Sequence, residues 1–456
     1  MDIIRAQIEK STYEMKLENE KLSSSLTKKV YLTDYAPKKV GDIEVWTEAF
    51  QCAVNDGEII VIPESDKIYY IDGTVVIPSN RRIEAYGAHI KQTDGTDVIM
   101  LRNSNTSDGT HKPLTDKNGN TNISVMGGFW EECCTERLGY GKSGKYDSSR
   151  SFFGVSTLFF FNHMNCLTVK DVTFCHAGGF CVQTGDIENA VFENIRFKEC
   201  FADGIHINGN TENVYIRDVK GYVGDDLVAL NMYDWQNSSV DFGPMRNVWC
   251  EDLELSEDSP YKAMRIEPGI YTFDNGSEID CSAENIVVRN VKGIQTYKMY
   301  FQTPSYHLDE TPERGKVGSG KNLYFENIDV DLVAPIDGFD NYMSGDPVTG
   351  SFAAFELGSN IESITFDGID LKVDKERFPM AFLTCVGPKS AINGQGKEAF
   401  DPYLNCNVDQ ITLRNIKVNG KPLDDYRSFV HEIVFDHIYP QCPLVTSGKI
   451  GKIINE

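Results

Sequence analysis

The chain has 456 residues, a length that suits either two ordinary domains or one long repeat domain. Hydrophobic residues make up 41% and aromatic residues 11%, which excludes a disordered chain and is enough for a continuous core. The net charge of −24 excludes a broad nucleic-acid-binding surface, because phosphate groups would meet no excess of lysine and arginine.

The first residues form a segment of distinct character. Residues 1–30 are highly charged with scattered apolar side chains, which predicts a helical arm before a catalytic domain over residues 31–456. We expect this arm to pack on the rest of the chain or on a second copy in a homo-oligomer. The start lacks a basic stretch followed by an apolar one, and no transmembrane segment is present. We therefore expect a cytoplasmic protein, with export and removal of a signal as the alternative.

Cysteine usage and the next elements fit this interpretation. The twelve cysteines show no paired C-x-x-C motifs, so we expect free thiols rather than disulfides or a zinc site. Residues 46–53 read as a short helix that caps one end of the fold. Strands are predicted at residues 59–63 and 74–78.

An internal repeat follows. An alternating apolar strand, a polar residue, then Asp or Asn and an aliphatic residue recur along the chain, with laps of roughly 23 residues at the shortest. The Asp or Asn position, once Gly and once His, is occupied by Asp171, Asn194, Asp218, Asp252, Asn290, Asn327, Gly368, Asn415 and His437.

This period predicts the fold class. Strands that alternate with period two and return at this interval indicate an all-β fold, a single-stranded right-handed parallel β-helix, with an N-terminal helical cap or arm. An antiparallel sandwich is the weaker alternative, because its turns would come every 8–12 residues. Asn165, Asn189 and Asn213 recur at similar turns, and we interpret them as a structural ladder.

Three aspartates stand at one point of two successive laps. Ala202-Asp203-Gly204 begins one lap, and Gly224-Asp225-Asp226 begins the next. Carboxylates brought together in this way repel, so one holds its proton while another stays ionised. That is the requirement for acid–base hydrolysis of a glycosidic bond, so these three residues are the candidate catalytic groups.

Stacking the strands in register predicts the residues around the aspartates. Val182, Ile207, Leu230, Ile266 and Phe301 are expected to point inward. One outward column contains Cys181, His206, Ala229, Arg265 and Tyr300, the next contains Gln183, Asn208, Asn231, Glu267 and Gln302, and Lys262 shares a column with Asp203 and Asp226. Such a patch has the donor and acceptor density of a sugar site, although β-helices also stack Asn and Asp structurally. We add Trp235 as a candidate sugar contact.

The same motifs resemble those of the polygalacturonases, glycoside hydrolase family 28, over residues 30 to 440. The resemblance rests on the two aspartate motifs at their expected interval and on Gly127-Gly128-Phe129-Trp130. It implies that Asp225 is the acid and that Asp203 and Asp226 activate water. The chain departs from the family where a Gly-His-Gly and an Arg-Ile-Lys motif are expected. There it has the strand around Arg265 and then Tyr300 and Gln302.

The resulting hypothesis is an inverting, exo-acting hydrolase of plant-derived, pectin-like oligosaccharides that needs no cofactor or metal. Long laps at residues 233–245, 268–284, 303–321 and 335–352 should wall the groove and favour short oligosaccharides, with Tyr233, Tyr271 and Phe273 as aromatic platforms. Lys262 and Arg265 are the nearest cations for a uronate, but we expect Lys262 to pair with Asp226, which favours a neutral sugar.

A uronate lyase that uses Lys262 or Arg265 as base and Ca²⁺ on the aspartates is one alternative. A non-catalytic carbohydrate-binding solenoid is another.

Overall fold

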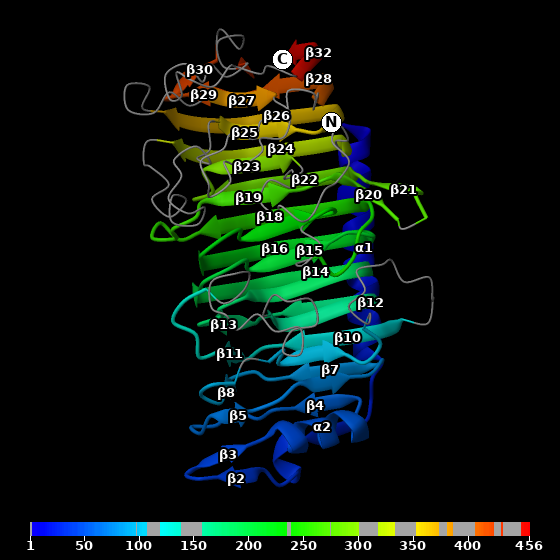
Figure 1. Cartoon of the computed structure of the whole chain (residues 1–456), viewed down its shortest axis with the longest axis vertical. Helices are drawn as coiled ribbons and strands as arrows, with labels where there is room; N and C mark the ends of the chain where they lie inside the picture. The colour runs from blue at the N-terminus through cyan, green and yellow to red at the C-terminus, as the bar shows by residue number, and fades with distance from the viewer. Residues whose placement is uncertain are drawn as a thin grey trace.

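The computed structural model describes residues 2–96, 98–106, 119–137, 157–234, 239–273, 275–300, 318–332, 353–373, 381–385, 406–423, 430–431 and 448–456. Its strands stack lap upon lap along one axis, and the main sheet pairings between laps are parallel (Figure 1). The predicted right-handed parallel β-helix is confirmed. Neither described α-helix has the length and apolar character that a membrane span requires.

Each lap contributes to three faces of the solenoid. The first face consists of β1 (Lys29–Tyr31), β4 (Ile59–Val61), β7 (Arg81–Glu84), β10 (Asn120–Met126), β12 (Thr157–Lys170), β14 (Phe180–Cys200), β16 (Thr211–Val223), β18 (Met245–Leu255), β22 (Ala283–Lys292), β24 (Ser319–Leu332), β26 (Asn360–Val373), β28 (Cys406–Arg414) and β32 (Gly448–Asn455). The second face has β3 (Ile43–Val45), β5 (Tyr69–Ile71), β8 (His89–Gln92), β11 (Phe129–Glu131) and β13 (Thr173–Cys175), continues through the ends of the long strands, and includes β29 (Lys417–Val418).

The third face has β6 (Val75–Ile77) and β9 (Leu101–Asn103), then the starts of β12 and β14. It continues with β15 (Ile205–Asn208), β17 (Val228–Asn231), β19 (Ala263–Ile266), β23 (Thr296–Tyr300), β25 (Ala353–Gly358), β27 (Ala381–Cys385) and β31 (Val430–His431). The antiparallel additions are β2 (Lys38–Val40) on β3, β30 (Lys421–Pro422) on β29, and the hairpin β20 (Gly269–Thr272) with β21 (Glu278–Cys281).

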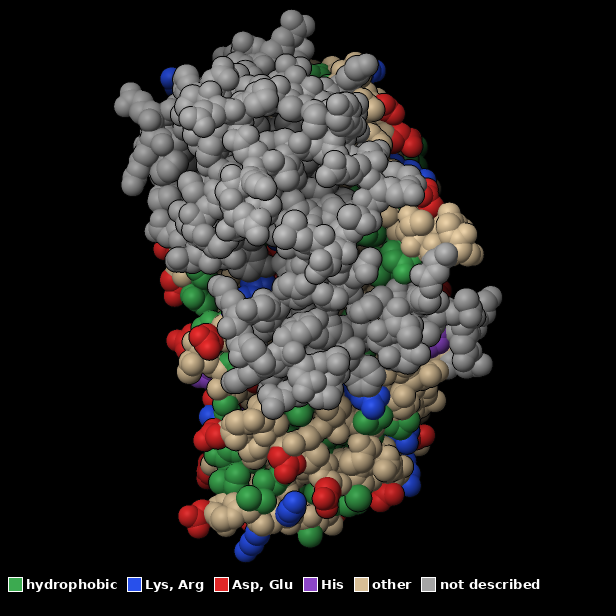
Figure 2. All heavy atoms as spheres, in the orientation of Figure 1, with side chains coloured by type: hydrophobic (Ala, Val, Ile, Leu, Met, Phe, Trp, Pro, Cys, Tyr) green, Lys and Arg blue, Asp and Glu red, His purple; other side chains and the backbone are tan. Residues whose placement is uncertain are grey.

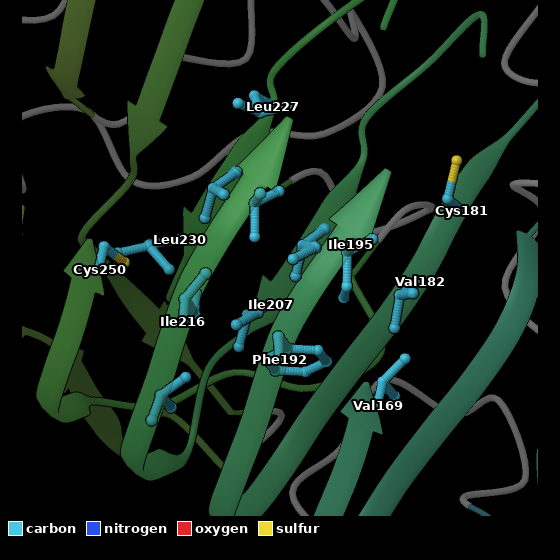
Figure 3. Close-up of a cluster of buried hydrophobic side chains, with 14 of the residues drawn as sticks. Val169, Cys181, Val182, Phe192, Ile195, Ile207, Ile216, Leu227, Leu230 and Cys250 are labelled. Atoms are coloured by element: carbon cyan, nitrogen blue, oxygen red, sulfur yellow. The ribbon is translucent and has the colours of Figure 1, made fainter. Parts of the chain in front are cut away.

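The interior is a set of apolar columns. On the first face Phe192, Ile216 and Cys250 pair in register, and all three are fully buried. Figure 3 shows these side chains beside Ile207 and Leu230 of the third face. Each such residue contributes about 1.5–3 kcal/mol by leaving water, so the columns supply most of the driving force that holds the laps together.

The repeated Asp and Asn positions have a conformational reason. Asp171, Asn194, Asp218, Asp252, Asn290, Asn327, Gly368 and Asn415 all have a positive φ, between 50° and 70°. Asn, Asp and Gly tolerate this left-handed region best, and it turns the chain from the first face to the second. The repeat found in the sequence is therefore the corner of the solenoid.

The predicted asparagine ladder is confirmed. Asn189 donates to Asn165 at 2.9 Å, and Asn213 donates to Asn189 at 3.0 Å. The ladder continues upward through Asn247, Asn285 and Asn322. These side chains satisfy one another at a turn, which supports the structural interpretation.

Two helices protect the solenoid. Helix α2 (Thr47–Asp56) covers the N-terminal end, as predicted for residues 46–53, and it follows the short 3₁₀ turn η1 (Leu32–Asp34). Helix α1 (Ile3–Ser24) stands upright along the first face, starting near β24 and ending near β10 (Figure 1). The predicted arm is thus a helix that packs on its own chain.

Helix α1 covers an apolar column on the outside of the first face. Ile8 packs with outward-facing side chains of successive strands. These are Val191, Tyr215, Trp249, Val287 and Tyr324. Charged groups fix the helix at both ends of the contact, where Arg5 pairs with Glu326 at 2.9 Å and Lys16 pairs with Glu193.

The charged side chains of the surface and the state of the cysteines agree with what the composition predicts. Figure 2 shows acidic and basic side chains interspersed along the edges of one face. The cysteines whose side chains the structure describes are free thiols, as predicted. They are Cys52, Cys133, Cys134, Cys166, Cys175, Cys181, Cys200, Cys250 and Cys281.

Candidate active site

The three predicted aspartates meet on the third face. Asp203 precedes β15 and the pair Asp225–Asp226 precedes β17, and these strands are neighbours in register. One oxygen from each carboxylate lies within 4.8 Å of the others. Their exposed fractions are 3%, 3% and 1%, and the Asp226 N–H donates to Asp203 Oδ1 at 3.0 Å.

The glycines of both motifs allow this close stacking. A Cβ on Gly224 would lie 2.4 Å from the carbonyl oxygen of Phe201, and one on Gly204 would lie 2.7 Å from that of Leu227. Real side chains do not reach such contacts, so the laps approach closely only because glycine stands there. The motif glycines thus bring the carboxylates together.

Each aspartate of the cluster lies beside a different cationic side chain. The pairs are His206 Nδ1 with Asp203 Oδ2 at 2.6 Å, Arg137 Nη1 with Asp225 Oδ2 at 2.7 Å, and Arg265 Nε with Asp226 Oδ2 at 3.3 Å. Oxygen clusters of this kind suit hard cations such as Ca²⁺, but here these three side chains already balance the three carboxylates.

His206 lies between two carboxylates. Its Nε2 is 3.1 Å from Asp234 Oδ2, opposite the Asp203 contact, and its ring stacks on Phe180 with centroids 4.0 Å apart. Burial lowers the pKa of His206, but the hydrogen bonds to Asp203 and Asp234 outweigh it and raise the pKa to about 9. The imidazole is therefore a cation at neutral pH and donates from both nitrogens.

Carboxylates outnumber cations in this buried region. The acidic groups are Asp203, Asp225, Asp226, Asp234 and Glu267, and the cations are Arg137, His206 and Arg265. Burial, followed by repulsion from Asp225, raises the pKa of Asp203, against the opposing effect of His206. Burial and repulsion within such a cluster favour the protonated form of one carboxyl group, which is the form that acid catalysis requires.

Arg265 is firmly held. Burial disfavours its charge, but Tyr261, Asp226 and further acidic groups raise the pKa of the guanidinium well above its ordinary value. Its Nη2 donates to the Tyr261 hydroxyl at 3.1 Å. Asp226 therefore pairs with Arg265, and the expectation that it pairs with Lys262 is wrong. Arg265 lies in β19 in register with Ala229, and its side chain reaches Asp226, whereas Lys262 precedes that strand.

The predicted amides extend the site along the strands. Gln183 donates to Asn208 Oδ1 at 3.2 Å, and Asn208 donates to the carbonyl of Asn231 at 3.3 Å. Asn231 in turn donates to Asp234 Oδ2 at 3.1 Å, which links the amides to His206. These side chains are all buried, and their network of hydrogen bonds fixes the orientation of the carboxylates beside it.

The predicted register is wrong at two places. Val182 pairs with Ile205 rather than Ile207, so Gln183 rather than Cys181 lies beside His206. Arg265 pairs with Lys298, not Tyr300. Both slips are of two residues, which leaves every side chain on the same face, so the alternation of the sequence carries no information about them.

The remaining predicted residues have mixed positions. Glu267 is buried directly after β19 and helps to raise the pKa of Arg265. Lys262 precedes that strand and is partly exposed. Tyr300 ends β23, but its side chain is not described, and Gln302 and Trp235 lie outside the described residues.

The predicted aromatic platforms form a cluster of their own. Phe242 stacks on Tyr271 with centroids 4.3 Å apart and contacts Tyr233 at 5.2 Å. Tyr233 is buried against the core, and Phe273 packs edge-on against Tyr271. The lap over residues 268–284 contains the β20–β21 hairpin, whereas residues 303–317 and 335–352 lie outside the described residues.

Sequence reasoning missed several groups of the site. Arg137 follows β11 by several residues and belongs to no repeat, so no pattern pointed to it. Asp234, Phe180 and Tyr261 each sit beside a predicted residue in sequence or register, but only their contacts reveal a role.

Comparison with solved structures agrees with the fold. The tailspike protein of E. coli bacteriophage HK620, as a double mutant, is similar with a TM-score of 0.52 and 12% identity, over 86% of this chain and 63% of that one. The family 28 exopolygalacturonase of Yersinia enterocolitica has a TM-score of 0.49 and 12% identity, over 94% of this chain and 78% of that chain. The exopolygalacturonase of Thermotoga maritima has a TM-score of 0.48 and 12% identity, over 97% and 96%.

At these identities the similarity establishes a fold and not a family. No protein-family model matches the chain, and no curated protein matches its sequence. The similarity to the tailspike protein, with a TM-score of 0.52, supports the fold alone, and membership of this chain in family 28 is not shown. Its chemistry has to be argued from the site itself.

Proposed function

We propose that the protein is a glycoside hydrolase that cleaves oligosaccharides by acid–base catalysis at Asp203, Asp225 and Asp226. The observation that carries the proposal is the buried cluster in which these three carboxylates approach within 4.8 Å while each contacts its own cation. Aspartates of the solenoid's corner ladder also have cationic partners, such as Asp218 with Arg196, but they are partly exposed, whereas the three carboxylates of the cluster are buried.

The contacts suggest a division of roles. Asp225 is the proposed acid, because its Oδ1 accepts no hydrogen bond from the described residues and can turn to a sugar oxygen. Asp226 is the proposed base, because the Arg265 guanidinium stabilises its ionised form. Asp203 uses both oxygens to hold the Asp226 N–H and His206, so it orients the pair and supports the base.

Inversion of configuration and exo action belong to the proposal on the strength of the family resemblance. Inverting enzymes usually separate acid and base by about 6.5–9.5 Å, and retaining ones by about 5–5.5 Å. The close oxygen approach within 4.8 Å is nearer to the second class. An NMR spectrum of the first-formed product distinguishes the two, and we expect the inverted anomer.

A neutral sugar, or a mixed oligosaccharide from a pectin-like source, is the proposed substrate. The buried acidic groups outnumber their cations, so an additional carboxylate at the cleavage position would be repelled. Arg265 is already committed to Asp226, which leaves it poorly placed as a uronate clamp.

The lyase alternative is weakened by the state of Arg265. A proton-abstracting base needs a neutral form, and the acidic groups around Arg265 raise its pKa well above the ordinary value. Lys262 remains as the candidate base for a lyase. The absence of an ultraviolet-absorbing unsaturated product would exclude that alternative.

The test is Asp225→Asn on a panel of neutral and uronate oligosaccharides. We expect turnover to fall by about 10³-fold or more, with sugar binding and folding retained, because the variant keeps the shape but has no proton to give. Asp370→Asn, on the second face, is the matched control and should keep full activity. Retention of over a tenth of the wild-type rate would remove Asp225 from the acid role. Sugar binding without turnover by the wild type would support a non-catalytic solenoid.

A further inference from the structure

Tyr261 lies beside the arginine that pairs with the proposed base. Its side chain is buried, as are those of Arg265 and Asp226. Tyr261 precedes β19, and Arg265 lies within that strand in register with Ala229. Asp226 in turn precedes β17, the strand that contains Ala229. Both partners of the guanidinium therefore stand before the strands, and the Arg265 side chain extends back toward them.

The two contacts of this guanidinium differ in kind. Its Nη2 donates a hydrogen bond to the Tyr261 hydroxyl at 3.1 Å. Its Nε lies 3.3 Å from Asp226 Oδ2 but makes no hydrogen bond with the described residues. An ion pair attracts from many directions, whereas a hydrogen bond requires a particular alignment. Within the described part of the chain, the Tyr261 hydroxyl is therefore the group that fixes the orientation of Arg265.

Glu267 is a competing partner for the same guanidinium. It follows β19 directly, whereas Tyr261 precedes that strand. The side chain of Glu267 is buried, and its charge acts on Arg265 and raises the pKa of the guanidinium. Without the Tyr261 hydroxyl, Nη2 would be left as a buried charged donor without this acceptor, and a carboxylate attracts such a donor strongly. The hydroxyl thus favours the contact with Asp226 over a contact with Glu267.

We propose that Tyr261 is a positioning residue for the base: its hydroxyl holds the Arg265 guanidinium against Asp226 and away from Glu267. The inference rests on the proposed function, in which Asp226 is the base. Tyr261 acts only through Arg265, because its own side chain is 1% exposed and has no surface to offer a sugar. Its loss should therefore affect the reaction step and leave substrate binding unchanged.

The first test is Tyr261→Phe, which removes the hydroxyl and keeps the ring. We expect kcat to fall by about 10-fold or more, with KM within about 2-fold of the wild type, because the base is misplaced while the sugar contacts remain. The matched control is Tyr297→Phe in the adjacent strand β23. Tyr297 is also fully buried, but its hydroxyl makes no hydrogen bond with the described residues. This control should keep the wild-type kcat and KM.

A double-substitution cycle tests whether Tyr261 acts through Arg265. Tyr261→Phe is measured in the wild type and in Arg265→Gln, where no guanidinium remains to be held. We expect the second comparison to show less than about a 2-fold change in kcat, because the two residues then act as one unit. A tyrosine that supports the site only by packing would cost the same factor in both backgrounds.

A further measurement needs neither turnover nor a folded Arg265→Gln protein. The Nε–H signal of Arg265 can be followed by NMR in the substrate-free protein, with its assignment taken from the signal that Arg265→Lys lacks. In Tyr261→Phe this signal should shift and its hydrogen should exchange faster with water, because the guanidinium has lost the hydrogen bond that orients it. In Tyr297→Phe the signal should stay at the wild-type position.

The outcomes separate this inference from the proposed function. If the wild type cleaves a glycoside, a Tyr261→Phe rate equal to that of Tyr297→Phe, an additive cycle or an unchanged Arg265 signal would each overturn the positioning role and leave the hydrolase in place. If the wild type cleaves no glycoside, the proposed function is overturned, and the contact between Tyr261 and Arg265 is a structural one only.

Discussion

The two ion pairs of His206 make the stability of the folded protein depend on pH. Its imidazolium donates to Asp203 on one side and to Asp234 on the other, within a buried environment. The pKa rises from 6.5 to about 9 on folding, so the two ion pairs stabilise the folded state fully below about pH 6.5. This contribution is lost as the pH rises through about 9.

We therefore expect the free energy of unfolding to decline between about pH 6.5 and 9, and the activity to fall as the imidazole loses its proton near pH 9. Asp234→Asn should move the imidazole titration to lower pH by removing one charged acceptor, and the decline should follow it. Histidine NMR and urea unfolding across pH 6 to 10 provide the measurements. An imidazole that titrates near 6.5 in the wild type would contradict the assignment.

Asn213 tests the turn ladder. It has a φ of 58° and bonds to Asn189 below and Asn247 above. Asn213→Ala should lose both hydrogen bonds and add the steric strain of a left-handed alanine, at a cost of about 2–4 kcal/mol. Asn213→Gly loses the same bonds without the strain, so it should cost about 1–2 kcal/mol less. Equal destabilisation in urea unfolding would show that backbone conformation has no part in the choice of asparagine.

At the scale of the element, α1 acts as a strap across the laps. Its 22 residues give a length of about 33 Å, which matches several strands spaced about 4.8 Å apart. It contacts β10, β12, β14, β16, β18, β22 and β24. A helix that runs across these strands links laps which otherwise contact only their neighbours.

We expect Ile8→Ala to lower the free energy of unfolding by about 2–5 kcal/mol, because Ile8 is buried against the aromatic column beneath the helix. The control is Ile4→Ala in the same helix, where the side chain is 39% exposed and the change should be within about 0.5 kcal/mol. Urea unfolding followed by tryptophan fluorescence reports on Trp249, which lies in that column. Equal effects of the two substitutions would show that the strap contributes little.

At the scale of the whole molecule, the net charge of −24 acts on every ligand that approaches. A uronate oligosaccharide would be repelled, and added salt would screen the repulsion and lower its KM. A neutral oligosaccharide would not feel this field. Salt dependence is therefore a test of substrate class that is independent of any substitution.

For the best substrate of the panel we expect KM to change by less than about 2-fold between roughly 0.05 and 0.5 M salt. A uronate oligosaccharide of equal length serves as the comparison, and its KM should fall over the same range. If the best substrate instead shows a KM that falls several-fold, the neutral-sugar proposal is wrong and a pectin-type acid is the substrate.

The sequence by itself determined the solenoid and the catalytic candidates. The Asp and Asn positions recur because each lap turns a corner through a left-handed residue, and that requirement is local. Asp203, Asp225 and Asp226 could be brought together on paper because one lap separates them. Glycine at 204 and 224 is a local requirement of the same kind.

The tertiary structure decided what surrounds the aspartates. Arg137 reaches Asp225 from a loop without a repeat, and Asp234 reaches His206 across a turn, so neither contact has a periodic signal. The choice of Arg265 over Lys262 depends on side-chain reach, because the predicted register of Ala229 with Arg265 is correct and still does not show which cation contacts Asp226. Charge pairing in a buried site is a property of distances between side chains, and those distances exist only once the laps are stacked.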